Sequence, residues 1–321
     1  MYRVVNPPAW NVFVPLYIFF KGLSVGAFVI SVLSTVFGVK SLKPLAWPAA
    51  AASVVSLALV PVMLLADLGQ PGRIWHLYVP AYFNPSSPLA WGSWLLVIYP
   101  ILLLWYTYLT YQARSSLMAP ADRVDLAASE AAAARESGMP AGGDALRVAG
   151  MAVLPVAVAA DSYTGFLLGV VKGNALWNSA LLPAYLLASA VLSGAALIAV
   201  LYVVGFGCGR LGPGSPVLST LGRIMLGAIA VELFFAISQW IVLGMASTQG
   251  RLALKLLFAD PLYLWGEVIA GLIVPLVILI SPKARENATG ITAAAILAII
   301  GSFLMRYTLI FVGLQAARLI G

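Results

Sequence analysis

Residues 12–38 read VFVPLYIFFKGLSVGAFVISVLSTVFG, an apolar run whose single charged member is Lys21. At a rise of about 1.5 Å per residue, a helix of this run is about 40 Å long and exceeds the roughly 30 Å hydrocarbon core of a bilayer. The apolar region of a cleavable signal peptide is shorter, about 7–15 residues. The run therefore predicts a membrane-spanning helix and not a cleavable signal.

Similar apolar runs recur along the whole chain. It has 321 residues, of which 62% are hydrophobic and only 9% are charged, with a mean hydropathy of +1.00. Soluble domains carry about 25% charged residues, so this chain has too few to cover a water-facing surface. The runs do not alternate as barrel strands would, and we predict an all-α integral membrane protein. The eight expected transmembrane helices cover residues 12–38, 44–66, 89–111, 147–170, 179–206, 217–245, 262–281 and 289–313.

A faint internal repeat suggests how the eight helices are arranged. The sequence GLSVGAF (22–28) in the first span is similar to VLSGAAL (191–197) in the fifth. Both combine serine with small residues that let helices approach closely. We therefore expect two four-helix bundles, made by spans one to four and five to eight. The expected units are residues 1–146 (three spans and the cytoplasmic loop 112–146), residues 147–170 (the span that completes the first bundle) and residues 171–321 (the second bundle).

The basic residues indicate which loops face the cytoplasm, where lysine and arginine are in excess. An even number of spans places both termini on one side. That side carries Arg3, Arg73, Lys172, Arg251, Lys255 and Arg318. The other carries Lys40, Lys43, Arg114, Arg123, Arg135, Arg147, Arg210, Arg223, Lys283 and Arg285. We expect a multi-pass protein of the cytoplasmic (inner) membrane with both termini outside, and attribute the net charge of +7 to topology and not to nucleic acid binding.

Ionisable side chains inside the spans are few, and such groups are expensive in a membrane and by default functional. They are Lys21, Asp161, Glu232, Glu267 and Arg306, with Asp67 at the end of the second span. Counted along the helices, most of them fall in the outer half of the membrane, so we favour a polar cavity that opens outward. The alternative is that Lys21–Asp67 or Arg306–Glu267 are salt bridges that lock the helices together.

The ligand-forming residues are too few for a resident metal or haem. The chain has one histidine, His76, and one cysteine, Cys208. A haem with two axial histidines, an iron–sulfur cluster and a zinc or copper site all need more such ligands. We expect no haem and no iron–sulfur cluster in this chain. Any redox cofactor is therefore a diffusible, lipid-soluble molecule or belongs to a partner.

The segment DSYTGFLLG (161–169) offers polar groups for a quinone, which requires an apolar pocket with a few hydrogen-bonding groups. Tyr163 could donate a hydrogen bond to a quinone carbonyl, and Asp161 could exchange the proton that accompanies each electron. The alternative is that Tyr163 packs against a neighbouring helix and bonds it.

The segment DLGQPGRIWHLYVPAYFNPSSP (67–88) places polar and turn-forming residues between two apolar runs. Its glycines and prolines predict an outer loop, because these residues favour turns. His76 titrates near neutral pH and could relay protons. The alternative is a surface histidine that faces lipid headgroups or a docked partner.

These segments in series resemble the NrfD/polysulfide reductase membrane-subunit family. The resemblance rests on DLGQPGRIWHL (67–77), NPSSPLAWGSW (84–94), YTGFLL (163–168) and LWNSALLP (176–183), together with the small residues of spans one and five. Their order covers about residues 10–200, and the eight spans fit the rest.

The resemblance implies a quinol-binding subunit without haem, built from eight helices. It implies an iron–sulfur partner subunit with several clusters and a molybdopterin catalytic subunit, docked on the outer side near the quinone site. The family tyrosine implicated in quinone binding corresponds to Tyr163, while Asp67 and His76 fall in the first loop motif. Lys21 occupies a position of the first span at which relatives differ.

The sequence thus predicts the membrane anchor and quinone-reactive subunit of a respiratory oxidoreductase. Such a subunit exchanges electrons between menaquinol or ubiquinol and the iron–sulfur partner, for reduction of a sulfur compound such as polysulfide, tetrathionate or thiosulfate, and does not itself act on that compound. We assign quinone binding to Tyr163, Asp161, Lys21, Asp67 and His76, and a proton path or structural pairs to Glu232, Glu267 and Arg306. The alternatives are a secondary transporter with an outward-facing polar cavity and an anchor without a quinone site.

Overall fold

The computed structural model describes residues 10–67, 72, 78–79, 87–117, 142–206 and 215–320. This part of the chain is helical, and eight of its helical segments are long and apolar enough to cross a membrane. The predicted all-α membrane protein with eight spans is therefore confirmed. The helices are α1 (Phe13–Thr35), η1 (Lys40–Leu45), α2 (Ala46–Asp67), α3 (Pro88–Leu117), α5 (Gly142–Gly169), α6 (Leu182–Phe206), α7 (Pro216–Ala246), α8 (Thr248–Ala259), η4 (Leu262–Ile273), α9 (Val274–Ile280), α10 (Pro282–Glu286) and α11 (Ala288–Ile320).

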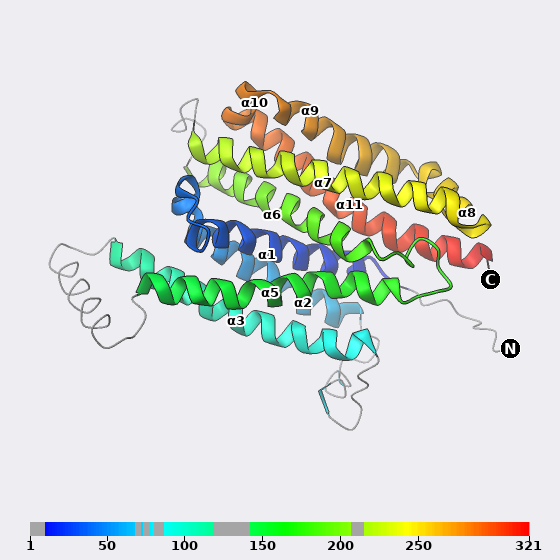
Figure 1. The fold of residues 1–321 in the computed structure, drawn as a ribbon, viewed down its shortest axis with the longest axis horizontal. Coiled ribbons are helices and arrows are strands. Elements are labelled where there is room, and N and C mark those ends of the chain that lie inside the picture. The colour runs from blue at the N-terminus through cyan, green and yellow to red at the C-terminus, as the bar shows by residue number, and fades with distance from the viewer. Residues whose placement is uncertain are drawn as a thin grey trace.

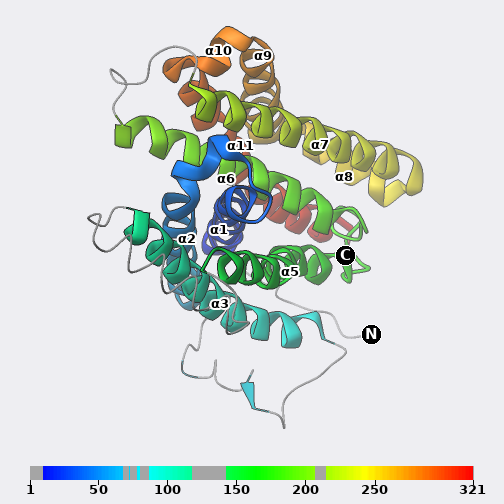
Figure 2. The same cartoon turned by 60° about the vertical axis from the view of Figure 1, so that its left-hand side comes forward.

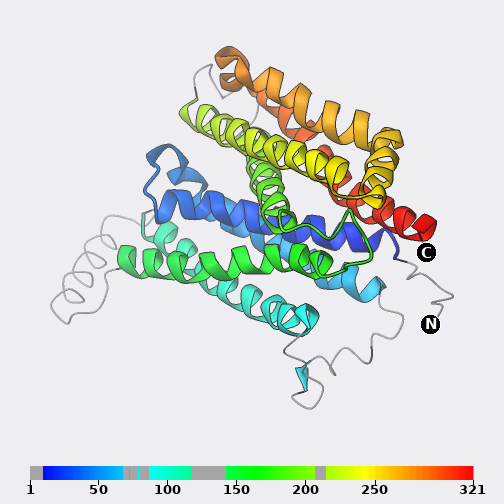
Figure 3. The same cartoon turned by 45° about the vertical axis from the view of Figure 1, so that its right-hand side comes forward.

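The spanning helices lie side by side along the long axis of the molecule, and α11 ends at the same end where α1 begins (Figure 1). Helix α1 is the most enclosed of them, because it packs against α2, α5, α6 and α11 at once (Figure 2). Helix α6 lies between α1 and α7 and joins the two halves of the chain (Figure 3). Since α1 packs against helices of both halves, the division into two four-helix bundles stays a prediction.

Glycines set the closest contacts between the helices. A Cβ atom on Gly26 of α1 would lie 1.9 Å from the carbonyl oxygen of Ala190, and one on Gly194 of α6 would lie 2.2 Å from the carbonyl carbon of Gly26. The small-residue segments that the sequence paired are therefore the place where α1 and α6 meet backbone to backbone, as expected for small residues in membrane helices. Gly271 and Gly301 bring η4 and α11 together in the same way.

The segment 247–261, which reads as a loop in the sequence, contains the helix α8. The hydroxyl of Ser247 accepts a hydrogen bond from the backbone N–H of Gly250, and this cap begins the helix. Ala253 and Leu257, one turn apart, are buried against the protein, while the basic residues of the helix are exposed. At 12 residues, α8 is too short to span a bilayer.

Candidate functional site

Lys21 lies on α1 with its side chain completely buried. Its Nζ donates hydrogen bonds to the backbone carbonyl of Asp161, at 3.2 Å, and to the hydroxyl of Thr164. The same Nζ lies 4.3 Å from the centre of the Tyr163 ring, which is the geometry of a cation–π contact. Lys21 therefore fastens α1 to the segment of α5 that the sequence singled out.

The carboxylate of Asp161 is buried and unsatisfied. The residue is 1% exposed, and neither carboxylate oxygen has a hydrogen-bond partner among the described residues. Its electrostatic neighbours are Lys21 and Arg306. Buried polar groups are nearly always hydrogen-bonded, because an unpaired one loses its solvation without compensation. The two free oxygens therefore mark a position that can accept hydrogen bonds from a ligand or from water.

The ring of Tyr163 packs against α3 at a glycine. A Cβ atom on Gly92 would lie 2.5 Å from Cδ2 of this ring, so only glycine leaves room for it. Tyr17 of α1 is an electrostatic neighbour of both Tyr163 and Asp67. The structure thus brings Lys21, Asp161 and Tyr163 into direct contact, and we call these three residues with Thr164 the Lys21 cluster. Asp67 lies near Tyr17, next to this cluster. His76 lies outside the described residues.

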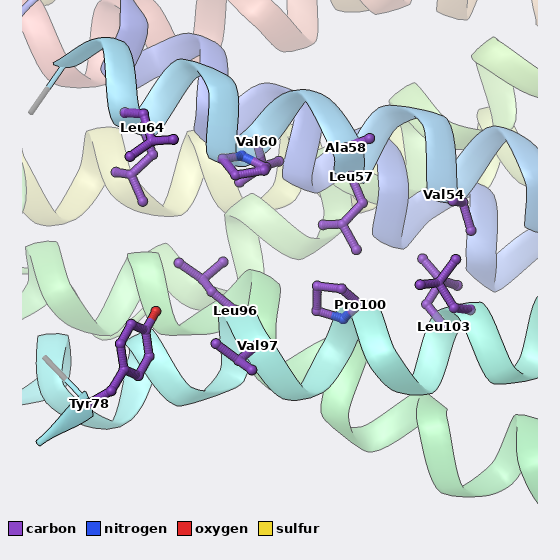
Figure 4. Close-up of a pocket in the computed structure, with 13 residues that line it drawn as sticks. Val54, Leu57, Ala58, Val60, Leu64, Tyr78, Leu96, Val97, Pro100 and Leu103 are labelled. Carbon is purple, nitrogen blue, oxygen red and sulfur yellow. The ribbon is translucent and has the colours of Figure 1, made fainter. Parts of the chain in front are cut away.

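A groove with a volume of about 440 Å³ runs between α2 and α3. Figure 4 shows Leu57 and Pro100 pointing toward each other across it, with the hydroxyl of Tyr78 at one end. Tyr78 is an electrostatic neighbour of Tyr163, which places this end of the groove close to the Lys21 cluster. The groove is lined by Val54, Leu57, Ala58, Val60, Pro61, Leu64, Leu65, Tyr78, Leu96, Val97, Pro100, Leu103 and Leu104.

Helix α3 connects the groove to Tyr163. Gly92, which contacts the ring, and Leu96, which lines the groove, are four residues apart and share one face of the helix. From Val54 to Leu65 the groove follows α2 for about 16 Å at 1.5 Å per residue. The polar cluster and the apolar groove are therefore neighbours along one face of α3.

The second half of the chain holds two buried carboxylates. Glu232 on α7 is 1% exposed, and its Oε2 has no hydrogen-bond partner among the described residues. The other carboxylate, Glu267, is satisfied. Glu267 lies on the π-helical segment η4, 2% exposed. Its Oε1 accepts a hydrogen bond from the hydroxyl of Tyr185, at 3.0 Å, and its Oε2 accepts one from Thr308, at 2.8 Å. Glu267 therefore joins three helical segments, η4, α6 and α11.

Arg306 lies between the two polar clusters. Its guanidinium donates to Ser189 Oγ at 3.0 Å and to the carbonyl of Ser302 at 2.7 Å, and Gly22 leaves space for it next to Lys21. Asp161, Glu232 and Glu267 are all within its electrostatic range. Lys21 and these four residues therefore form one connected set of buried charges inside the protein.

The sequence left open two salt bridges, Lys21–Asp67 and Arg306–Glu267, and the structure shows other contacts for these residues. Lys21 is held by Thr164 and a backbone carbonyl and not by Asp67. Arg306 is held by serine and carbonyl oxygens, whereas Glu267 takes its hydrogen bonds from hydroxyls. Neutral donors and acceptors thus contact Lys21, Arg306 and Glu267 directly, and the opposite charges act over a longer range.

A small cavity of about 20 Å³ adjoins the Glu267 cluster, enough for about one water molecule. Its lining includes Tyr185, Gln239, Glu267 and Thr308. Gln239 donates its amide to the carbonyl of Leu176 at 3.0 Å, while its Oε1 is buried without a partner among the described residues. This cavity can hold a water molecule but not a quinone ring.

The sequence interpretation missed several residues of these clusters: Tyr17, Thr164, Tyr185, Gln239 and Thr308. One signal could have found Thr308. The dipeptide Tyr-Thr occurs at 106–107 on α3, at 163–164 on α5 and at 307–308 on α11. In the last two places the threonine bonds a buried ionisable side chain, whereas Thr107 bonds a backbone carbonyl. In the part of the chain that the structure describes, no group of three or more histidine, cysteine or acidic side chains is placed to hold a metal ion.

Comparison with known proteins covers nearly the whole chain. Residues 3–317 match the family model described as polysulphide reductase, NrfD. A selenate reductase subunit of Mesobacillus selenatarsenatis is 27% identical over 97% of this chain and 75% of its own length. A protein of Halobacterium salinarum that carries the provisional name of a dimethyl sulfoxide reductase membrane subunit is 26% identical over 98% of this chain and 71% of its own. The Hdr-like menaquinol oxidoreductase integral membrane subunit of Archaeoglobus fulgidus is 26% identical over 92% and 68%.

Proposed function

The chain belongs to the polysulphide reductase NrfD family, and from this premise we propose that it is the quinone-reactive membrane subunit of a respiratory oxidoreductase complex. The observation that carries the proposal is the buried carboxylate of Asp161. Both its oxygens are free, and it lies beside Lys21 and Tyr163. Tyr163 contacts α3 at Gly92, one turn from the apolar groove that begins at Leu96. A quinone needs this combination, because its ring carries two polar oxygens and its tail is a long hydrocarbon.

The residues of the cluster have separate roles in this proposal. The hydroxyl of Tyr163 donates a hydrogen bond to one ring oxygen, and the positive charge of Lys21 favours negative charge that develops on the ring. Asp161 accepts a proton when quinol is oxidised, since quinol gives up two protons with its two electrons. Asp67 and Tyr17 connect the cluster to the outer side. His76 is proposed as a quinone-site residue only from its place in the loop motif.

The α2–α3 groove holds the tail. The groove is apolar along about 16 Å of α2, and its near end adjoins the stretch of α3 that contacts Tyr163. Its volume of about 440 Å³ falls in the range of small-molecule sites. Menaquinol is the favoured quinol, because one of the relatives is named as a menaquinol oxidoreductase subunit.

The partners follow from the family and its relatives. Electrons leave for an iron–sulfur subunit that docks on the outer side, and a molybdopterin subunit beyond it reduces the terminal substrate. A sulfur compound such as polysulfide, thiosulfate or tetrathionate is the proposed substrate class. Two relatives carry names that refer to dimethyl sulfoxide and to selenate. Complexes that contain this type of membrane subunit therefore differ in their terminal substrate.

Glu232, Glu267 and Arg306 are proposed as a proton path or as structural pairs in the second half. The water-sized cavity beside Glu267 and the free Oε1 of Gln239 support the proton path. The two hydroxyl hydrogen bonds to Glu267 support the structural role.

The test is Tyr163→Phe in the assembled complex, with quinol oxidation measured at steady state. Loss of the phenol removes one hydrogen bond, and we expect kcat/KM for quinol to fall about tenfold while the complex assembles normally. Tyr307→Phe is the matched control, because Tyr307 precedes the corresponding threonine of α11. Unchanged quinol kinetics in the Tyr163→Phe complex contradict the proposal.

A further inference from the structure

A second large groove lies between α6 and α7, away from the Lys21 cluster. Its volume is about 490 Å³, and its residues follow one face of each helix. The lining consists of Ala184, Leu187, Ala188, Val191, Arg223, Ile224, Gly227, Ala228, Val231 and Phe235. Nine of these residues are apolar, and Arg223 is the charged member. The groove is open on the outside of the protein, where a membrane protein meets lipid.

Arg223 is exposed on α7 inside a membrane-spanning segment. It has no hydrogen bond or ion pair with any residue that the structure describes, although arginine carries five N–H donors. Charged side chains in spans normally face the protein interior and pair there, because hydrocarbon does not solvate them. An anion from outside the chain would accept hydrogen bonds from the N–H donors of Arg223.

The depth of Arg223 fits the headgroup region of one leaflet. Helix α7 has 31 residues and is about 46 Å long, so it extends about 8 Å beyond each side of a 30 Å hydrocarbon core. Arg223 lies seven residues from Pro216, or about 10 Å along the helix, close to that boundary. From Arg223 to Phe235 the groove continues for about 18 Å, comparable to the roughly 15 Å depth of one leaflet's hydrocarbon.

Two exposed lysines belong to the element that contacts α7 near Arg223. Thr220, one turn from Arg223, shares a hydrogen bond of 2.9 Å with Ser41 of η1. Lys40, next to Ser41, and Lys43 are both exposed. Arg223 and these lysines belong to the end of the molecule that carries the larger number of basic residues. Cytoplasmic leaflets attract such residues through their anionic lipids.

We propose that the α6–α7 groove binds an anionic phospholipid. Its phosphate accepts hydrogen bonds from Arg223, with Lys40 nearby, and one acyl chain lies along Ile224, Gly227 and Val231 toward Phe235. Charge complementarity selects the headgroup, since a guanidinium binds phosphate oxygens through two parallel hydrogen bonds. This site is independent of quinone binding, which is proposed for the other face of the protein, between α2 and α3.

The test is native mass spectrometry of the complex purified with the full chain. Phosphatidylglycerol and phosphatidylcholine with identical acyl chains are added in turn, and the retained lipid is counted. We expect the wild type to retain phosphatidylglycerol about fivefold more strongly, as is typical for the loss or gain of one basic contact at a membrane surface. Arg223→Gln removes this preference, and Arg223→Lys keeps most of it. Arg147→Gln, an exposed arginine on α5, is the matched control and leaves the preference unchanged.

A second pair of variants tests the acyl chain without changing charge. A Cβ atom added at Gly227 would meet no atom within 4 Å, so the first atom of a Gly227→Leu side chain enters the groove without a clash. Gly205→Leu on α6 is equally free of contacts and lies outside the groove, which makes it the control. We expect only Gly227→Leu to lower retention. Equal retention of both lipids by the wild type, equal losses in Arg223→Gln and Arg147→Gln, or full retention in Gly227→Leu would each overturn the proposal.

Discussion

Each half of the chain ends in a helix that carries a Tyr-Thr pair, and the two pairs serve different surroundings. On α5, Thr164 accepts a hydrogen bond from the cation of Lys21, the neighbouring carboxylate of Asp161 is unsatisfied, and an apolar groove of about 440 Å³ lies close by. On α11, Thr308 donates to the carboxylate of Glu267, which Tyr185 also satisfies, beside a cavity for about one water.

The difference between the two sets of surroundings indicates which buried carboxylate can bind a ligand. A carboxylate whose oxygens already accept hydrogen bonds from the protein has little to offer a ligand, however deeply it is buried. A carboxylate with free oxygens next to a cation and a groove can exchange a proton with a bound molecule. Glu232 in the second half also keeps one oxygen unpartnered within the described part of the chain, but it is not among the residues that line either large groove. We therefore place quinone chemistry in the first half and a polar relay or lock in the second.

Removal of Lys21 should have the largest effect on this comparison. Lys21→Met leaves Asp161 without its first electrostatic neighbour, and an uncompensated buried charge destabilises a protein by about 3–5 kcal/mol. We expect less assembled complex, a lower melting temperature and no quinol turnover. The double variant Lys21→Met/Asp161→Asn should recover the stability but not the turnover. Normal assembly and turnover of Lys21→Met would show that the first cluster is not electrostatically coupled.

Neutralising one carboxylate in each half comes next. Asp161→Asn removes the proposed proton acceptor, and we expect quinol turnover to fall by about a hundredfold, as is common when a general base is lost. Glu267→Gln should leave the KM for quinol within about twofold of the wild type, because Glu267 does not adjoin the groove. Steady-state kinetics of both complexes measure this, and a raised KM in Glu267→Gln alone would reverse the assignment of the two halves.

A large side chain in the α2–α3 groove should weaken binding of the quinol tail and leave binding of the quinol ring unchanged. Ala58→Phe places a large side chain in the groove, and we expect the KM to rise about tenfold for a long-tailed quinol and little for a short-tailed analogue. Val55→Phe is the control, because Val55 lies on the same helix, 65% exposed, outside the groove lining. Equal effects on both quinols would mean that the tail lies elsewhere.

The smallest effects are expected from the two threonines themselves. Thr164→Val and Thr308→Val each remove one hydrogen bond between a hydroxyl and a charged group, with a cost of about 2 kcal/mol in unfolding free energy. Thermal unfolding should show similar losses for both. Quinol kinetics should separate them, since only Thr164 holds a residue of the proposed quinone site. If Thr308→Val lowers quinol affinity as much as Thr164→Val does, the two clusters act as one.

Hydropathy alone determined the protein's class and the positions of its spans. Eight apolar runs are long enough to cross the hydrocarbon core of a bilayer, and all eight are helices of about the predicted bounds. The reason is physical, because a backbone in hydrocarbon must bond itself and helices do this locally. Hydropathy also identified the buried ionisable residues, because a charged side chain is conspicuous within an apolar run. These residues are Lys21, Asp161, Glu232, Glu267 and Arg306. Hydropathy did not predict the helix cap at Ser247 or the short amphipathic helix α8.

The tertiary structure decided which of these residues meet. No linear pattern shows that Lys21 bonds Thr164 and not Asp67, or that Arg306 takes serine and carbonyl oxygens and leaves Glu267 to two hydroxyls. Those contacts depend on how far each helix is rotated and how closely the helices approach. Gly26 and Gly194 set that approach for α1 and α6, and Gly92 sets it for Tyr163. Sequence thus determined which polar groups enter the membrane, and helix packing determined which of them remained free to bind a ligand.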